Sequence, residues 1–490
     1  MMESSTHKQI LKSTGIVGGS QIVIILLGIV RTKIIAVLLG PIGIGLIGLY
    51  QSLIDILRNA TGLGINFSAV RDVAISNSTG DTLKISRTIT VLRLWAFVTG
   101  LFGMMFSVLF CNLLSKITFG NADHSYEIAL LSIVIFIMAV SGGQLAILQG
   151  LRELAKMSKA NIFGAIIGFL ISIPIYWYYG VGGIVPALVF TSISTLALSW
   201  YYSQKIKIVD VVINKTEAFK EGLGMAKLGF FTVVTALVGA LILYVVRIFV
   251  QRKLGLDGVG YFQAAWSLST VYLAIVLNAM GADFYPILSA INSDNYKVNQ
   301  LINDQTEIAL LIASPIIIGM LAFLPLIINI MYSARFGGAV NILQWQILGT
   351  FFRVLSFPLG YLLLAKGKGI LYVITDLLFN IPFLIFVILG WPYFGLQITG
   401  ISYLISYLIC FFCVLCFSMK LSKFAFTKMN VKLILVFGAL CLISFLNAYY
   451  CNTWVKYLFS FFLVILGLIL SLTKLNKIVN VKSLLLRFYK

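Results

Sequence analysis

The sequence is poor in charged residues, which make up 11% of its 490 amino acids, whereas 60% of them are hydrophobic. A soluble domain carries about 25% charged residues, because its surface is solvated. With a mean hydropathy of +1.02, the composition excludes a soluble globular protein of this length. Runs of ~20 apolar residues recur along the chain, and this pattern predicts an all-α, multi-pass membrane protein.

The groups that catalysis and metal binding need are also scarce. There are two histidines, His7 and His124, and we assign neither to an acid–base cluster. Cys410, Cys413 and Cys416 have a metal-like spacing, but the surrounding run LICFFCVLCF indicates a ridge of small side chains on a membrane helix. We therefore expect no enzyme, no catalytic residues, no metal site and no cofactor. The sequence also contains no ATP-binding motif.

The net charge of +20 comes from basic residues scattered between the apolar runs, which disfavours nucleic acid as a partner. Lys and Arg concentrate in alternate segments, on the side where the N-terminus lies. This asymmetry predicts that both termini are cytoplasmic and that the number of spans is even. We count about fourteen spans. The few basic residues of the predicted outer segments are Lys116, Arg252, Lys253, Arg335 and Lys456.

An internal repeat organises the predicted helices. LGPIGIGLIGLYQSL at 39–53 aligns without gaps with LGLDGVGYFQAAWSL at 254–268, so that Gly40 pairs with Gly255 and Gly45 with Gly260. We interpret the motif as a tight turn between helices that needs small residues for close packing, rather than as a nucleotide loop. Because the copies are six spans apart, they form a parallel repeat.

The repeat predicts two pseudo-symmetric six-helix bundles followed by two C-terminal helices. We place the N-terminal bundle at 1–204, a cytoplasmic linker at 205–225 and the C-terminal bundle at 226–420. Two additional helices and a basic cytoplasmic tail occupy 421–490. In folds of this kind the binding site lies between the halves, near the midplane of the membrane.

Several ionisable residues fall inside predicted spans, where an unpaired charge is costly. Arg31 and Arg247 lie about 13 Å and about 12 Å along their helices before the paired glycines. Lys33 is expected to snorkel outward, because it faces away from Arg31. Arginine binds phosphate bidentately, so cations lining a wet cavity suit an anionic substrate. The candidate cavity cations are Arg31, Arg58, Arg247 and Arg353.

Three acids accompany these cations, namely Asp55, Asp283 and Asp376. Asp55 and Arg58 share a helix face, so they can neutralise each other as a structural pair. Asp283 and Asp376 can pair with an arginine or take part in proton or sodium coupling. For each arginine the alternative to substrate binding is an ion pair between helices or a contact with a lipid head group.

The pattern VRTKIIAVLLGPIGIGLIGLYQSL, followed by GLGINFSAVRDVA at 62–74, resembles O-antigen translocases. These are the Wzx-type flippases of the polysaccharide transporter family, within the multidrug/oligosaccharidyl-lipid/polysaccharide exporter superfamily. The resemblance implies movement of an undecaprenyl-pyrophosphate-linked oligosaccharide repeat unit from the cytoplasmic to the periplasmic leaflet, by alternating access through a cationic cavity. It also implies a bacterial inner-membrane protein of O-antigen and lipopolysaccharide biosynthesis, in contact with membrane lipids and other polysaccharide-assembly membrane proteins.

Two other functions remain open at this point. A multidrug or small-molecule antiporter of the same superfamily would have an acidic cavity for cationic drugs, and the arginines argue against it. An integral membrane polymerase or ligase of polysaccharide assembly would need a large periplasmic loop, whereas the predicted outer loops are short.

Overall fold

The computed structural model describes residues 2–206, 209, 211, 214–450 and 454–479, which fold into helices with no strand among them. Ten helical segments of this described part are long and apolar enough to cross a membrane. Four of them run for 38 to 54 residues, about twice the length that the hydrocarbon core requires. The predicted class, an all-α polytopic membrane protein, is confirmed, and the total of about fourteen spans stays a prediction.

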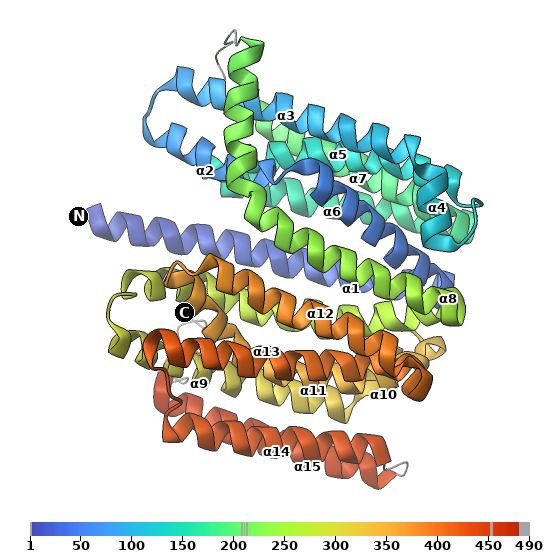
Figure 1. The fold of residues 1–490 in the computed structure, drawn as a ribbon, viewed down its shortest axis with the longest axis vertical. Helices are drawn as coiled ribbons and strands as arrows, with labels where there is room; N and C mark the ends of the chain where they lie inside the picture. The colour runs from blue at the N-terminus through green and yellow to red at the C-terminus, as the bar shows by residue number, and fades with distance from the viewer. Residues whose placement is uncertain (1, 207–208, 210, 212–213, 451–453, 480–490) are drawn as a thin grey trace. The chain divides into compact units, whose positions relative to one another are not determined.

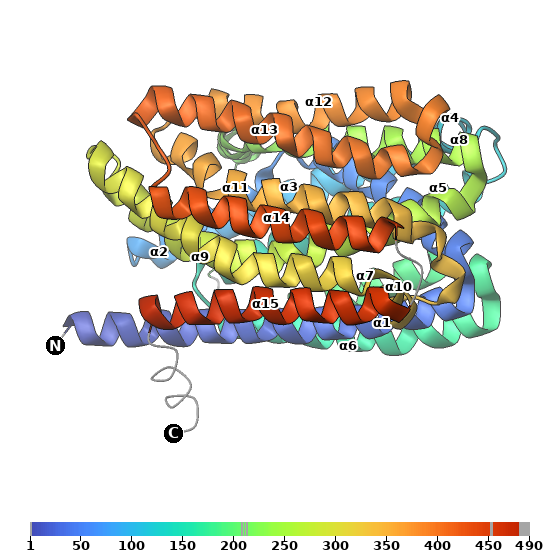
Figure 2. The same cartoon turned by 90° about the horizontal axis from the view of Figure 1, so that it is seen from below.

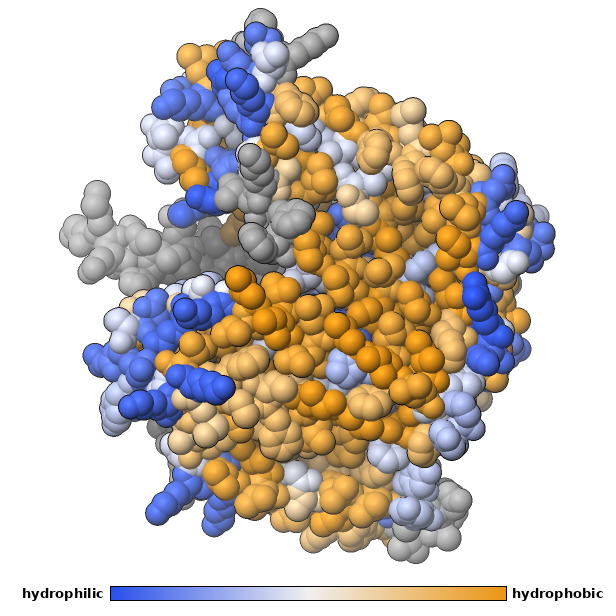
Figure 3. Space-filling model, in the orientation of Figure 1, coloured by the Kyte–Doolittle hydropathy of each residue, from blue (hydrophilic) through white to orange (hydrophobic). Residues whose placement is uncertain are grey.

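The surface agrees with a lipid environment. In Figure 3 the flanks of the helices carry hydrophobic side chains, and hydrophilic residues gather near the helix ends. Large apolar side chains such as Phe102, Leu170 and Phe462 are exposed on these flanks. In water such a surface would drive association, whereas hydrocarbon solvates it.

The chain divides into two compact units, Met1–Gly260 with Met331–Ser333 (unit 1) and Tyr261–Ile330 with Ala334–Lys490 (unit 2). The helices of unit 1 are α1 (Met2–Gly62), α2 (Ile65–Ser78), α3 (Thr82–Leu109), α4 (Cys111–Phe119), α5 (Ser125–Gly150), α6 (Leu154–Tyr179), α7 (Ile184–Gln204) and the first part of α8 (Lys215–Ala290). Those of unit 2 are the rest of α8, α9 (Asn295–Ala322), α10 (Leu324–Met331), α11 (Gly338–Ala365), α12 (Gly369–Phe394), α13 (Ile398–Ser422), α14 (Lys428–Tyr450) and α15 (Trp454–Val479). The predicted bundle boundaries at 204, 225 and 420 stay a prediction.

The repeated glycine motif marks a kink in each of the two longest helices. Gly40 interrupts α1 with φ 64° and ψ −165°, and Gly255 interrupts α8 with φ 70° and ψ −168°. Side chains other than glycine rarely adopt a positive φ, so both positions require glycine. The two copies thus share an unusual backbone conformation at aligned residues. The interpretation of the motif as a repeated turn is confirmed at these residues.

The two motifs also contact each other within unit 1, and the contact is reciprocal. A Cβ atom on Gly45 would clash with the carbonyl oxygen of Leu256, and a Cβ atom on Gly260 would clash with that of Pro41. Pro41 and Leu256 are aligned residues, as are Gly45 and Gly260. Glycine is therefore needed at both places for the close approach of one backbone to the other.

The first part of α8 packs against α3. Arg87 Nη2 lies 2.7 Å from Glu217 Oε2 and 2.6 Å from Glu221 Oε1. Trp95 Nε1 donates to the carbonyl oxygen of Ala218 over 2.9 Å, and the Ala218 side chain is buried in the same apolar cluster as Trp95. Residues 215–225, at the end of the predicted linker, are thus helical and docked on unit 1. Nearby, α3, α5 and α7 lie side by side (Figure 1).

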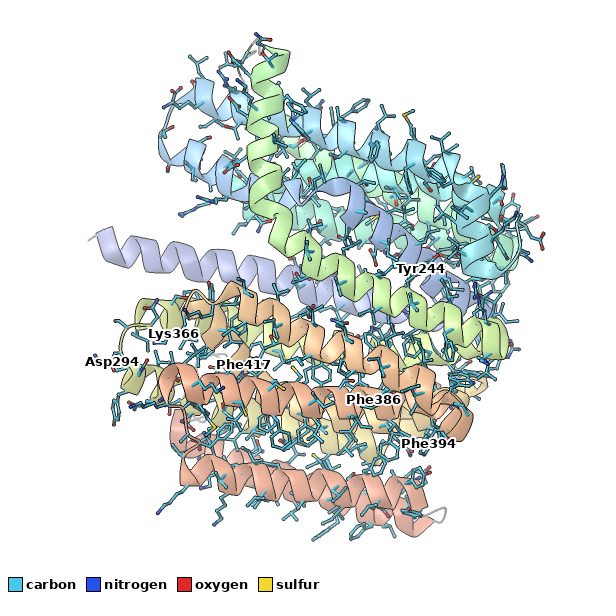
Figure 4. All side chains as sticks on the ribbon, viewed as in Figure 1. Tyr244, Asp294, Lys366, Phe386, Phe394 and Phe417 are labelled. Atoms are coloured by element: carbon cyan, nitrogen blue, oxygen red, sulfur yellow. The ribbon has the colours of Figure 1, made fainter. Side chains whose placement is uncertain are left out.

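In unit 2, α14 and α15 both pack on α9, as Figure 2 shows. Asp294 caps α9 by accepting the backbone N–H groups of Tyr296 and Lys297. These hydrogen bonds, with that of Lys297 foremost, hold the pKa of the Asp294 carboxyl below its ordinary value. Lys366 Nζ donates to Asn295 Oδ1 over 2.7 Å at the same end of the unit, where Figure 4 labels Asp294 and Lys366.

Candidate substrate-binding pocket

Arg31 lies on the first leg of α1, before the kink at Gly40, and its half-buried side chain lines a pocket of unit 1. The Nε atom of Arg31 is buried and has no hydrogen-bond partner among the residues that the structure describes. A buried guanidinium N–H without a partner is unfavourable, and the rest of the Arg31 side chain, which is half-buried, lines the pocket. Lys33 does not line this pocket.

The pocket encloses about 330 Å³ and has two chemically different walls. Arg31, Gln51 and Arg58 form one wall, and the two legs of α1 both contribute to it because the helix kinks between them. The rest of the lining comes from Ile54 and from α5 and α7, and the polar members of the α5 and α7 part are Ser141, Thr191, Ser192 and Thr195. We call the first wall the arginine wall and the part from α5 and α7 the hydroxyl wall.

Asp55 sits behind the arginine wall and is not itself a lining residue. Its Oδ1 atom accepts a hydrogen bond from Gln51 Nε2 over 3.1 Å and lies 3.8 Å from Arg58 Nη2. The two ionic side chains are 35% and 41% exposed, so this ion pair is loose and partly solvated. Arg58 therefore contacts Asp55, as the structural-pair alternative predicts, and still lines the pocket.

Arg247 is in a different position. It is buried in unit 1, donates to Ser52 Oγ and interacts electrostatically with Asp55. It does not line the pocket. The sequence could not place it, because its offset from Arg31 in the repeat is one residue, which turns a side chain by about 100° on a helix. Arg247 thus ties α8 to α1 behind the arginine wall.

The remaining predicted site residues belong to unit 2. Arg353 on α11 lies beside Tyr403 and Tyr407 of α13, and its Nη1 atom is buried with no hydrogen-bond partner within the described ranges. Asp376 on α12 accepts a hydrogen bond from Asn380 Nδ2 over 3.2 Å. Asp283 is on α8, and its side chain lies outside the described residues. The predicted cavity between the two halves stays a prediction.

One further cation, the half-buried Arg93, connects three helices of unit 1. Arg93 lies within α3, and its Nε atom donates to Gln144 Oε1 of α5 over 3.3 Å. Its guanidinium carbon is 5.6 Å from the ring centre of Trp200, and Ser203 Oγ donates to the same Gln144 oxygen over 2.7 Å. Arg93 therefore joins α3, α5 and α7. Its place within an apolar run of the sequence is the feature that could have indicated a cation inside a helix.

The hydroxyl wall was also missed from the sequence, although its spacing was visible. Thr191 and Thr195 are four residues apart in the run TSISTLALS and so share a helix face. The GAIIG motif of α6 packs against this face. A Cβ on Gly168 would lie 2.7 Å from Thr191 Cγ2, and one on Gly164 would lie 3.6 Å from Thr195 Cα. The α6 helix therefore packs against the threonines of the hydroxyl wall.

Solved structures show the class of fold. The chain superposes on the "Lipid II flippase MurJ, inward closed conformation" with a TM-score of 0.70 at 16% identity, covering 94% of this chain and 98% of that one. It superposes on an inward-facing multidrug resistance MATE family transporter of the MOP superfamily with a TM-score of 0.68 at 16% identity, covering 81% and 95%. The chain thus shares the fold of these two structures.

Sequence comparisons show the family. A family profile described as "Polysaccharide biosynthesis protein" matches residues 34–341, more than half of the chain, and the chain belongs to this family. The "Lipid III flippase" of Escherichia coli (strain K12) is 24% identical over 363 residues, which are 71% of this chain and 83% of that protein. The resemblance drawn from the N-terminal motif is confirmed at this level. The relatives are transporters rather than catalysts, which confirms the expectation that the chain is not an enzyme.

Proposed function

We propose that the protein is a flippase for a lipid-linked sugar precursor, and that the pocket of unit 1 binds the phosphate-bearing part of this substrate. The observation that carries the proposal is the arginine wall. Two arginines, Arg31 and Arg58, line the same pocket. Arginine donates several hydrogen bonds and keeps its charge, so such a wall selects an anion. The named relative, a lipid III flippase, supports a lipid-linked substrate.

The size of the pocket indicates that it holds only one part of the substrate. At about 330 Å³ it is near the lower limit of small-ligand sites, which span roughly 300–1,000 Å³. This space suits a head-group portion such as a pyrophosphate with an adjoining sugar, rather than a whole oligosaccharide. The lipid tail would remain in the bilayer, beside the apolar flanks of the helices.

The proposal also covers the substrate, the direction of transport and the source of energy. The substrate would be an undecaprenyl-pyrophosphate-linked O-antigen repeat unit, carried from the cytoplasmic to the periplasmic leaflet of the bacterial inner membrane by alternating access. Both termini would be cytoplasmic, and an ion gradient or the membrane potential would drive the cycle, with Asp55, Asp283 or Asp376 as coupling groups. A cationic drug does not match the arginine wall, because like charges repel in a confined space.

A deletion strain tests the proposal. Without a flippase the lipid-linked repeat unit accumulates in the inner leaflet, and the intact gene restores its export. We expect Arg31→Ala to fail in this rescue, and Arg252→Ala to succeed. Arg252 lies in the same unit and donates to the carbonyl oxygen of Ile117, outside the pocket. Export of the lipid-linked unit at the normal rate in the deletion strain would contradict the proposal.

A further inference from the structure

The hydroxyl wall has a definite hydrogen-bonding state. Thr191 Oγ1 donates to the carbonyl oxygen of Ala187 over 2.7 Å, and Ser192 Oγ donates to that of Leu188 over 2.8 Å. Thr195 Oγ1 donates to the carbonyl oxygen of Thr191 over 3.1 Å. Each hydroxyl therefore uses its single proton within its own helix. Its oxygen lone pairs are left to accept hydrogen bonds from whatever enters the pocket.

The two walls together define a ligand. The arginine wall only donates hydrogen bonds, so it pairs with an anionic group. The α7 hydroxyls of the other wall bond to carbonyl groups of α7 in this structure, so their lone pairs are available to a group that donates. An ionised phosphate has no proton to donate at neutral pH, and neither does a polyprenyl chain. Sugar hydroxyl and acetamido N–H groups do donate. A sugar bonded directly to a phosphate presents both kinds of group within one small ligand.

Gly168 of α6 makes a close contact with this wall, whereas Gly164 does not. Because Gly168 has no side chain, the Thr191 methyl group packs directly against the α6 backbone. A methyl group at position 168 would lie 2.7 Å from it, closer than real contacts allow, and would displace Thr191. The Thr191 side chain is thus held by two contacts. Its methyl group packs on α6, and its hydroxyl donates to the carbonyl oxygen of Ala187.

We propose that Thr191, Ser192 and Thr195 form a carbohydrate subsite that recognises the sugar attached to the phosphate. The pocket would then select its substrate by the donor groups of that sugar as well as by charge. This inference rests on the proposed function, since it assigns a second part of the same substrate to the same pocket.

The test compares two ligands on the purified full-length protein in lipid nanodiscs. One is undecaprenyl pyrophosphate, and the other is the same lipid carrying one N-acetylhexosamine. We expect Thr191→Val and Thr195→Val to weaken binding of the sugar-bearing lipid about 3- to 10-fold, the weight of a neutral hydrogen bond, and to leave binding of the bare lipid unchanged. Arg31→Ala should weaken binding of both ligands.

Valine keeps the shape of threonine, so these variants should fold. Thr99→Val is the matched control, because Thr99 also donates to a carbonyl of its own helix, that of Trp95, and lies outside the pocket. Equal weakening for both lipids in the valine variants, or none for either, would overturn the carbohydrate subsite while leaving the arginine wall in place. If the wild-type protein binds neither lipid, both proposals fail together.

A second pair of variants tests the support from α6. Gly168→Ala should displace Thr191 and reproduce the sugar-specific loss of Thr191→Val. Gly164→Ala should bind both lipids as the wild type does, since its new methyl group would lie at an ordinary contact distance of 3.6 Å from Thr195. The same binding loss for both alanine variants would count against the subsite.

Discussion

Replacement of Arg31 by alanine should change ligand binding and stability in opposite directions. The Nε atom of Arg31 is buried without a hydrogen-bond partner in the described part of the chain. A buried polar group in this state costs about 1–3 kcal/mol. Alanine removes that cost, so the ligand-free variant should unfold at a higher temperature than the wild type, or at the same one.

Ligand binding should respond in the other direction. A charge-assisted hydrogen bond contributes about 1.5–3 kcal/mol, so losing one from Arg31 should weaken the binding of undecaprenyl pyrophosphate about 10- to 150-fold. Arg31→Lys keeps the charge and loses the planar fork, so it should fall between alanine and the wild type.

The assay is a thermal unfolding curve for each variant, recorded with and without the lipid at several concentrations. A ligand that binds only the folded state raises the midpoint in proportion to the logarithm of its concentration, so the same curves report both quantities. If Arg31→Ala binds the lipid as tightly as the wild type does, Arg31 does not bind the pyrophosphate. If the ligand-free variant is strongly destabilised, Arg31 is a structural residue and the prediction is wrong.

Other residues of unit 1 give further expectations. Gly260→Ala should lower the free energy of unfolding by about 1–3 kcal/mol, because its methyl group would clash with the backbone at Pro41. Gly28 has open space around it, so Gly28→Ala is the neutral control, and equal melting temperatures for the two variants would contradict the glycine contact. Arg58→Gln should change stability by less than about 1 kcal/mol, because its ion pair with Asp55 is loose, and it should reduce export in the deletion strain. A large melting shift for Arg58→Gln would indicate a tighter pair. Arg87→Ala should speed amide hydrogen exchange in residues 215–225, because it releases Glu217 and Glu221. Lys84 is exposed one turn away, so Lys84→Ala is the control and should leave exchange unchanged; unchanged exchange in Arg87→Ala would show that Trp95 alone holds this segment.

The sequence predicted the fold class and the special backbone of the glycine motif for clear physical reasons. Apolar runs of this length have no place in a soluble protein, so the helical membrane class followed from composition alone. The paired glycines predicted a turn because few other residues adopt its backbone angles, and Gly40 and Gly255 adopt nearly the same pair of angles. Helical phase predicts that Arg31 and Lys33 face different ways, and Arg31 but not Lys33 lines the pocket of unit 1.

The rest of the site depended on information that one sequence does not hold. A one-residue offset was enough to leave the direction of Arg247 open. The positive-inside rule could not place Arg93 inside α3, because it measures charge bias along the chain and not burial within a helix. Thr191 and Thr195 resembled the many small polar residues of membrane helices. Only their position in the same pocket as Arg31 and Arg58 distinguishes them, and that position depends on tertiary packing.

The reciprocal contact between the glycine motifs has a consequence for the origin of this chain. If the two copies stood on separate polypeptides, Pro41 against Gly260 and Gly45 against Leu256 would be the two equivalent halves of a twofold-symmetric dimer interface. Gene duplication and fusion of such a half-length ancestor would retain the interface and release each copy to mutate alone. The aligned partner of Arg247 is Thr32, so the two copies now differ in charge at this position. A directional transporter benefits from that asymmetry, because a symmetric dimer presents the same groups from both of its subunits.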